Sequence, residues 1–380
     1  MAFKEYLMIP GPTPLPEKVM ASMAKQMVGH RGPNFAKIYK EVEEGVKWAH
    51  QTKNDVLFVT GSGTAGMEAS VVNMLSPGDK VVIVNIGNFG DRFVKICKAY
   101  GLNVVDLKIE RGKSADPNEV DKALSENKDA KALLVQQNET STAVINDIEA
   151  IAKVAKKHDI LIIVDAISGL LTIPLKTDDW GLDVVISGSQ KAFMVPPGLA
   201  MVSLSKKAWK AYESSKLPKH YFDFGTLKKF SEKGQTYTTP PETIFFAMQA
   251  GIAILKQEGF ENILARHEKN MRAVRAAAVG CGMTLFVKDE KAASRAVTAI
   301  FPPEGIDAEK IRSEMRSRFG VELAPGQGEF KGKLFRIGHL GYVDKLDIIA
   351  AFSGIELLLK EFGSKVELGK GVTAAIKELA

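Results

Sequence analysis

Two charged residues that follow apolar runs are the first candidates for chemistry in this chain of 380 residues. Asp165 follows the run 160–164 (ILIIV), and Lys191 follows a second run, 182–186, after the short linker SGSQ. Each run has the length and β-branched content of a buried strand, and open sheets bind ligands beyond the carboxyl ends of their strands. A buried carboxylate and a buried amine are costly unless something occupies them. A pyridine ring that carries an aldehyde is a ligand that would use both.

A glycine-rich segment, 61–66 (GSGTAG), lies between a predicted strand at 56–60 and a helix predicted to begin near Met67. Its pattern also occurs in dinucleotide-binding loops, but those require an acidic residue at the end of the next strand. That strand, 80–85 (KVVIVN), ends in Asn85, which disfavours a nicotinamide oxidoreductase. Glycines still allow a ligand to approach closely, and free amides at a helix N-terminus bind phosphate. A plain helix-entry turn is the alternative.

Four segments together identify a family resemblance: VDAISG at 164–169, SGSQKAFMVPPG at 187–198, PGPTPLPE at 10–17 and LFRIGHLG at 334–341. The chain resembles the class V, fold-type I aminotransferases that use pyridoxal phosphate, in particular the alanine–glyoxylate/serine–pyruvate group. The resemblance implies an α/β fold with a mostly parallel seven-stranded sheet in a large domain and a smaller α+β C-terminal domain. The expected division is an N-terminal arm (1–16), a large cofactor-binding domain (17–255) and a small domain (256–380).

The same resemblance implies roles for individual residues. Lys191 would form the Schiff base with the cofactor, and Asp165 would pair with its pyridinium nitrogen. The further cofactor-binding positions that it implies are Ser62, Gly63, Thr64, Phe89, Thr140, Ile167, Gln190, Tyr237 and Thr239.

These positions divide by the part of the cofactor that they would contact. The triplet 62–64 and Gln190 would hold the phosphate, Phe89 would stack on the pyridine face, and Thr140 would lie near the phenolic oxygen. Thr239, with Tyr237 near it, would reach the phosphate in the neighbouring subunit, so that a homodimer shares its active sites. The alternatives from the residues alone are a core hydrophobe for Phe89 and a helix cap for the hydroxyls after residue 136.

Substrate binding is expected at Arg336 and at Gly11 in the arm. An arginine between apolar residues and a glycine suits a bidentate carboxylate clamp, and the resemblance makes Arg336 the residue that holds the substrate α-carboxylate. A structural salt bridge is the alternative.

Composition favours an ordinary globular protein without nucleic-acid or membrane partners. The 51 basic and 45 acidic residues give a net charge of +6, and both signs alternate along predicted helices, as in KEVEEGVK at 40–47. This pattern indicates a solvated surface. The two cysteines, Cys97 and Cys281, have no metal-site or disulfide spacing. No metal is expected, and the N-terminus lacks a signal-peptide core, so a soluble, cytoplasmic protein is expected.

The elements needed to position these residues follow from the apolar pattern. The arm is predicted to have no helix or strand, residues 206–238 show no clear periodicity, and a connecting helix is predicted over 251–280. Further strands of the large domain are predicted at 103–109, 132–136 and 199–205. In the small domain, strands are predicted at 297–301, 320–323 and 333–337, and helices at 307–318 and 344–361.

The resemblance implies ping-pong transfer of an amino group from alanine or serine to glyoxylate or pyruvate, in which Lys191 would act as the base. Phosphoserine, aspartate or an aminophosphonate remain alternative donors. A cysteine desulfurase-type lyase is a further alternative on the same fold, but the plausible loop at 322–333 contains no cysteine.

Overall fold

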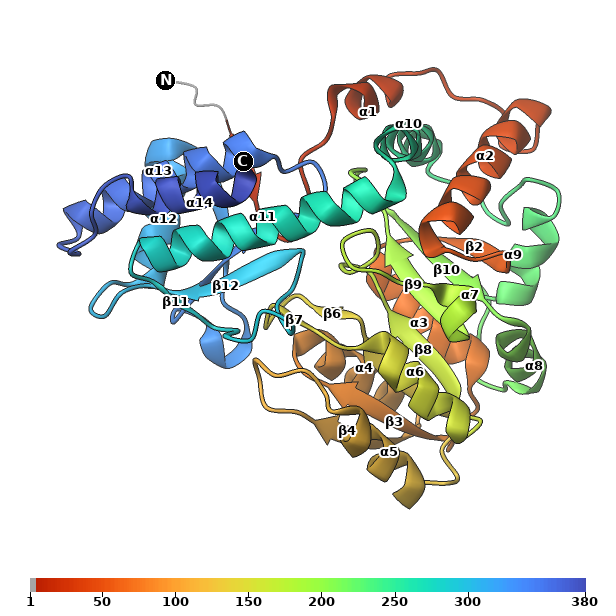
Figure 1. The fold of residues 1–380 in the computed structure, drawn as a ribbon. Coiled ribbons are helices and arrows are strands. Elements are labelled where there is room, and N and C mark those ends of the chain that lie inside the picture. Colours follow the sequence, from red (N-terminus) through yellow and green to blue (C-terminus); the bar gives the residue numbers. More distant parts are fainter. Residues whose placement is uncertain (1–4) are drawn as a thin grey trace.

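The computed structural model describes residues 5–380. Its larger sheet has seven strands in the order β2-β10-β9-β8-β5-β3-β4 (Figure 1). The strands are β2 (Asp55–Thr60), β3 (Lys80–Asn85), β4 (Asn103–Lys108), β5 (Ala132–Gln136), β8 (Leu161–Asp165), β9 (Val184–Gly188) and β10 (Leu199–Leu204). Strand β10 runs opposite to the other six strands, which are parallel to one another, so the expected mostly parallel seven-stranded sheet is confirmed.

Helices cover both faces of this sheet because its strands are apolar on both sides. In β2, Val56 and Phe58 point into one core, whereas Leu57 and Val59 point into the other. The first core is covered by α2 (Pro33–His50), α5 (Pro117–Glu126), α6 (Ile148–Lys157) and α10 (Glu242–Glu258). The second is covered by α3 (Gly63–Met74), α4 (Asn88–Ala99), α8 (Lys206–Ser214) and α9 (Phe224–Ser231). Because apolar side chains alternate between the two faces of the strands, the sheet is buried between two layers of helices.

The smaller sheet has five strands in the order β1-β13-β14-β12-β11. They are β1 (Tyr6–Met8), β11 (Thr284–Leu285), β12 (Val297–Phe301), β13 (Val321–Pro325) and β14 (Phe335–Gly338). Its helices, α11 (Phe260–Gly280), α12 (Ala308–Phe319), α13 (Lys345–Glu361) and α14 (Lys370–Leu379), enclose a third core. In Figure 1, α11 and α14 lie side by side.

Short elements complete the fold. They are α1 (Glu17–Ser22), the hairpin of β6 (Asn138–Glu139) and β7 (Val144–Ile145), α7 (Thr177–Trp180) and the 3₁₀ turn η1 (Gly328–Phe330).

Three sequence predictions about elements were wrong. The arm does contain a strand, β1, which pairs in parallel with β13 and ties the N-terminus to the small sheet. The predicted helix over 251–280 is two helices, because Gly259 (φ +88°) ends α10 before α11 begins. Residues 206–238 contain α8 and α9. The domain division stays a prediction; the predicted boundary at 255/256 falls within the last turn of α10.

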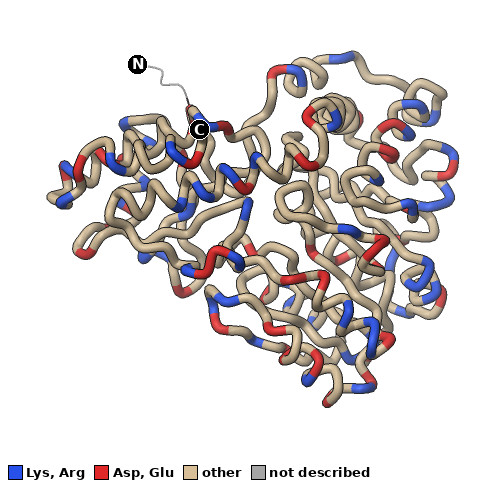
Figure 2. The backbone as a smooth tube through the Cα atoms, in the orientation of Figure 1, with Lys and Arg blue, Asp and Glu red and all other residues tan. Residues whose placement is uncertain are grey.

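No helix among residues 5–380 is both long and apolar enough to cross a bilayer. Basic and acidic residues are interspersed along the backbone of both the large and the small sheet regions (Figure 2).

Candidate active site

Two adjoining cavities lie at the carboxyl ends of β5, β8 and β9. The first has a volume of about 200 Å³, the second about 290 Å³, and they share Phe89, Thr140 and Lys191 in their walls. The other residues lining the first cavity are Ser62, Gly63, Thr64, Arg92, Asn138, Asp165, Ile167, Ser168 and Gln190. The other residues lining the second are Ile9, Pro10, Gly11, Glu322, Leu323, Ala324, Pro325, Gln327 and Arg336. Parallel strands bring their carboxyl ends to one edge, which explains the position of both cavities.

Asp165 and Lys191 line the first cavity together. Asp165 ends β8 and is 3% exposed, and its Oδ1 accepts the backbone N–H of Ile167 at 2.9 Å. Burial raises the pKa of Asp165 to about 7. The Lys191 ammonium donates to the carbonyl of Pro10 at 2.5 Å, and burial, with the nearby Arg336 charge, lowers the pKa of Lys191 to about 8. Both groups are therefore poised to titrate near neutral pH.

The triplet Ser62, Gly63 and Thr64 forms the start of α3, four residues earlier than the sequence predicted. Ser62 is the N-cap residue, is exposed, and makes no side-chain cap hydrogen bond. A Cβ on Gly63 would lie 2.5 Å from Ile167 Cδ1, so only glycine leaves this turn open beside the cavity. Helix-start amides that face a cavity suit an anion.

Gln190 closes the same end of the first cavity. Its side-chain oxygen is buried and has no hydrogen-bond partner among the described residues. Because a carboxamide can turn its NH₂ group into either position, this side chain can offer a donor to a ligand there.

Arg92, Asn138 and Ser168 also line the first cavity, and sequence reasoning missed all three. The Arg92 guanidinium donates to Thr64 Oγ1 at 2.8 Å and lies over the Phe89 ring, 4.6 Å from its centroid. Ser168 lies 2.8 Å from both Thr140 Oγ1 and Asn138 Nδ2. A signal existed for Arg92, which follows Phe89 by one helical turn.

Arg336 lies in β14 and is 3% exposed. Its Nε donates to the carbonyl of Pro325 at 2.9 Å and its Nη1 to the carbonyl of Thr140 at 2.7 Å. Within residues 5–380 it forms no ion pair, so a structural salt bridge is not what holds it. Burial lowers the pKa of Arg336 to about 10, and the side chain presents a fixed cation to the second cavity.

Gly11 brings the arm against Lys191. A Cβ at this position would lie 2.3 Å from Lys191 Nζ, and its φ of +129° is one that residues with side chains rarely adopt. Thr13 fastens the arm by donating its hydroxyl to the carbonyl of Lys191 at 3.1 Å. The arm thus forms one wall of the second cavity.

Tyr237 and Thr239 do not line either cavity of their own chain. Tyr237 packs against His220 and Phe230, and Thr239 is exposed. Arg31 donates to the carbonyls of Thr236 and Tyr237 at 2.7 and 2.8 Å. This loop is therefore held in place with Thr239 facing outward.

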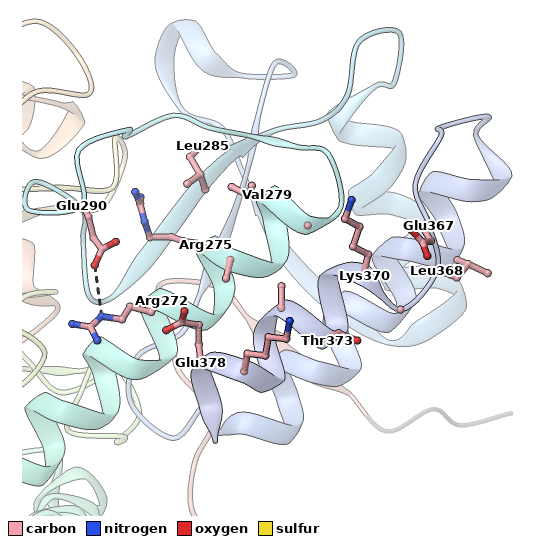
Figure 3. A pocket seen from close by; sticks show the side chains of 15 residues that line it. Arg272, Arg275, Val279, Leu285, Glu290, Glu367, Leu368, Lys370, Thr373 and Glu378 are labelled. Atoms are coloured by element: carbon pink, nitrogen blue, oxygen red, sulfur yellow. Dashed lines mark ion pairs between the residues drawn. The ribbon is translucent and has the colours of Figure 1, made fainter.

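A groove of about 1020 Å³ lies between α11 and α14 (Figure 3). Arginine, lysine and glutamate side chains from both helices line it, and Arg272 pairs with Glu290 at 3.6 Å. It shares no residue with the two cavities around Lys191, which remain the candidate active site.

Comparison with known proteins decides the family. Residues 5–329 match the family described as aminotransferase class-V. The chain belongs to this family. The resemblance seen in the sequence is confirmed, and the protein is a class-V aminotransferase.

Three similar proteins carry different names. The chain is 46% identical to the "Soluble hydrogenase, small subunit" of Synechococcus sp., over 100% of both chains. It is 36% identical to the serine–glyoxylate aminotransferase of Methylorubrum extorquens (98% of this chain, 95% of the relative). It is 34% identical to the L-aspartate–glyoxylate aminotransferase of Paracoccus denitrificans (99% and 96%).

A solved structure confirms the fold of this class-V aminotransferase. The ureidoglycine–glyoxylate aminotransferase of Bacillus subtilis superposes with a TM-score of 0.93 at 30% identity, covering 100% of this chain and 98% of that one. The fold-type I architecture expected from the sequence is therefore confirmed.

Proposed function

We propose that this aminotransferase uses pyridoxal phosphate to move the amino group of serine or alanine to glyoxylate or pyruvate in a ping-pong reaction. The single observation that carries the proposal is that Asp165 and Lys191 line the same cavity, with Arg336 in the cavity that adjoins it.

The residues of the first cavity fit the cofactor. The start of α3 and the unpaired Gln190 carboxamide match a phosphate, Phe89 offers an aromatic face, and Asp165 offers a carboxylate to a ring nitrogen. Thr140 and Ser168 supply hydroxyls on a neighbouring wall. When bound, pyridoxal phosphate supplies an electron sink that stabilises negative charge at the substrate α-carbon.

The chain's own residues would bind the substrate and move its proton. Arg336 would hold the substrate carboxylate, since its Nε and Nη1 are tied to carbonyls and leave Nη2 for the cavity. Lys191 has a pKa of about 8, so an appreciable fraction is neutral near pH 7.5 and can accept the α-proton. Asp165 must be ionised to keep a ring nitrogen protonated, and a cation next to it would lower its pKa from about 7.

A small, neutral donor suits the second cavity. Its cationic lining residues within the described chain are Lys191 and Arg336, so a second carboxylate or a phosphate on the donor lacks a partner there. Glu322 lines the same cavity, and its carboxylate, which pairs with Arg312 and Arg316 at 3.8 Å, offers no positive charge to such groups. Gln327 can hydrogen-bond a hydroxyl, which suits serine. Aspartate stays the alternative donor, because one relative is named for it.

The cysteines of the chain give little support to hydrogenase or lyase chemistry. Iron–sulfur clusters typically take four thiolates, whereas this chain has two cysteines, buried in different cores. Burial raises the pKa of each thiol to about 12, which also argues against Cys281 as the nucleophile of a desulfurase.

The experiment is a half-reaction with the purified protein and pyridoxal phosphate. The bound cofactor should give a visible absorption band that serine and alanine each remove and that glyoxylate or pyruvate restores. Lys191→Ala should abolish turnover while pyridoxal phosphate still binds. If serine and alanine leave the band unchanged while aspartate or phosphoserine removes it, the proposed donors are wrong.

A further inference from the structure

Glu139 is a buried carboxylate that the proposed reaction does not use. It is 0% exposed and lies in β6, directly before Thr140. It forms no ion pair with any residue from 5 to 380. A buried charge without a cation needs several hydrogen bonds to be tolerated, and Glu139 receives four.

Glu139 accepts two hydrogen bonds from the first turn of α4 and two from Ser141. One oxygen, Oε2, accepts the backbone N–H groups of Phe89 at 2.9 Å and Gly90 at 3.2 Å. The other, Oε1, accepts the backbone N–H of Ser141 at 3.0 Å and its hydroxyl at 2.6 Å. The Ser141 oxygen in turn accepts the N–H of Asn88 at 2.9 Å. The first three amides of α4 are therefore satisfied by Glu139, two directly and one through Ser141.

This arrangement replaces a conventional helix cap. Gly87 is the N-cap residue of α4 and has no side chain to offer, so the amides need an acceptor from elsewhere. A Cβ on Gly87 would lie 2.2 Å from Glu139 Cγ, so the glycine makes room for the carboxylate. The carboxylate also faces the positive end of the helix dipole.

The first turn of α4, which Glu139 holds, includes Phe89, the aromatic residue of the proposed cofactor cavity. Phe89 donates its own backbone N–H to Glu139, and its ring lines both cavities. Arg92, one turn further along α4, lies over the same ring and reaches Thr64. Displacing the first turn of α4 would therefore move the aromatic wall against which a cofactor ring packs.

We propose that Glu139 is a positioning residue that holds the start of α4 so that the Phe89 ring keeps its place against the cofactor. The proposal rests on the proposed function, because it needs pyridoxal phosphate in the first cavity. Glutamine cannot replace the carboxylate. Both oxygens accept from N–H groups, so the NH₂ group of a glutamine would face a donor whichever way it turned.

The test compares Glu139→Gln with a matched control elsewhere in the chain. Glu356 is 3% exposed, accepts the backbone N–H groups of Gly369, Gly371 and Val372 at the start of α14, and lines neither cavity. Glu356→Gln thus makes the same chemical change at another helix start. We expect both variants to lower the melting temperature.

Only Glu139→Gln should alter the cofactor. We expect its dissociation constant for pyridoxal phosphate to rise a few-fold to about tenfold, the range of one aromatic contact, and its visible circular dichroism to change. Phe89→Ala should weaken binding similarly, and the double variant should be little worse than either single one, because both changes act through the same ring.

Some results would overturn the proposal. One is that Glu139→Gln, like Glu356→Gln, differs from wild type in melting temperature alone. Another is that the effects of Glu139→Gln and Phe89→Ala on cofactor affinity add fully. If Glu139→Gln does not fold, Ser141→Ala carries the test. It removes the acceptor of the Asn88 N–H and one of the four hydrogen bonds of Glu139, and leaves the three backbone hydrogen bonds in place. Unchanged cofactor affinity and dichroism in this variant would contradict the role of this network. A wild-type protein that gives no visible band with pyridoxal phosphate overturns the proposed function itself, and the role of Glu139 with it.

Discussion

Asp165 and Lys191 lie where burial opposes the charge of each side chain. The pKa of Asp165 is raised to about 7 and that of Lys191 is lowered to about 8, in both cases chiefly because the groups are removed from water. Residues that disfavour the folded chain in this way are common at sites where function, not stability, selects the side chain. The resulting loss of folding stability should be measurable in the protein without cofactor.

Asp165→Asn should stabilise the cofactor-free protein at alkaline pH. The folded protein keeps Asp165 protonated up to about pH 7, whereas the unfolded chain loses this proton near pH 4, so the free energy of unfolding falls as the pH rises through that window. Above pH 7 the variant should be more stable by up to about 4 kcal/mol, and the difference should vanish near pH 4. Urea unfolding at pH 4, 6 and 8 measures this. A variant less stable than wild type at pH 8 would contradict the assigned cause of the shift.

Arg336→Lys should weaken substrate binding and leave the cofactor in place. Lysine keeps the positive charge but cannot bind the carbonyls of Pro325 and Thr140 while also presenting a planar fork. We expect KM to rise about tenfold or more for both the amino and the keto acid, since both carry a carboxylate. Steady-state kinetics and cofactor titration measure the two effects.

The control for this change is Arg275→Lys. Arg275 is also buried and donates to two carbonyls, those of Val287 and Lys288, but it lines neither cavity. Unchanged KM values for Arg336→Lys, or a similar rise in KM for Arg275→Lys, would show that the clamp has been assigned to the wrong residue.

At the scale of elements, strand β1 fixes the N-terminal arm to the small sheet and so sets the position of the cavity wall that the arm forms. Strand β1 pairs with β13, and the chain that follows passes Gly338 so closely that a Cβ there would lie 2.2 Å from the backbone of Ile9. The next residue, Pro10, supplies the carbonyl that holds Lys191. One glycine in β14 thus decides whether the arm reaches the site.

Gly338→Ala should displace the arm and reduce turnover while the large sheet stays folded. We expect kcat/KM to fall by about tenfold or more, because the wall formed by Pro10 and Gly11 retreats from Lys191. Far-ultraviolet circular dichroism should show little change. Gly29→Ala is the control, since a Cβ at Gly29 meets nothing within 4 Å. Wild-type kinetics for Gly338→Ala would contradict this role of the arm.

The elements also show what the sequence could predict. Strands β3, β5 and β12 have the predicted bounds, because continuous apolar runs define buried strands. The start of α3 was predicted four residues too late, because GSGTAG contains glycines that disfavour a helix, whereas close packing against Ile167 requires a glycine at position 63. Glu139 was missed because a buried acid that caps a distant helix has no local signal. Strand β1 was missed because its partner lies over 300 residues away.

At the scale of the whole molecule, the position of Thr239 bears on whether the active site is formed by one chain or by two. It is exposed and lines neither cavity of its own chain, yet Arg31 and the ring contacts of Tyr237 hold its loop in place. An ordered loop that presents a hydroxyl outward fits the proposal that Thr239 serves the active site of a second copy. In a two-fold symmetric dimer, each loop would then complete the site of its partner.

Mixing two inactive variants tests this sharing. Lys191→Ala removes the base of its own site, and Thr239→Glu should block the partner's site by placing a negative charge beside the cofactor phosphate. Each homodimer should be inactive, but a hybrid dimer would carry both changes in one site and neither in the other. If subunits exchange freely in an equal mixture, half of the dimers are hybrids with one intact site, so activity should recover to about a quarter of the wild-type value. If Thr239 served its own chain, every site would carry one of the changes and the mixture would stay inactive. Sedimentation analysis of the mixture should show dimers. A monomer that turns over substrate at the wild-type rate would rule out a shared site.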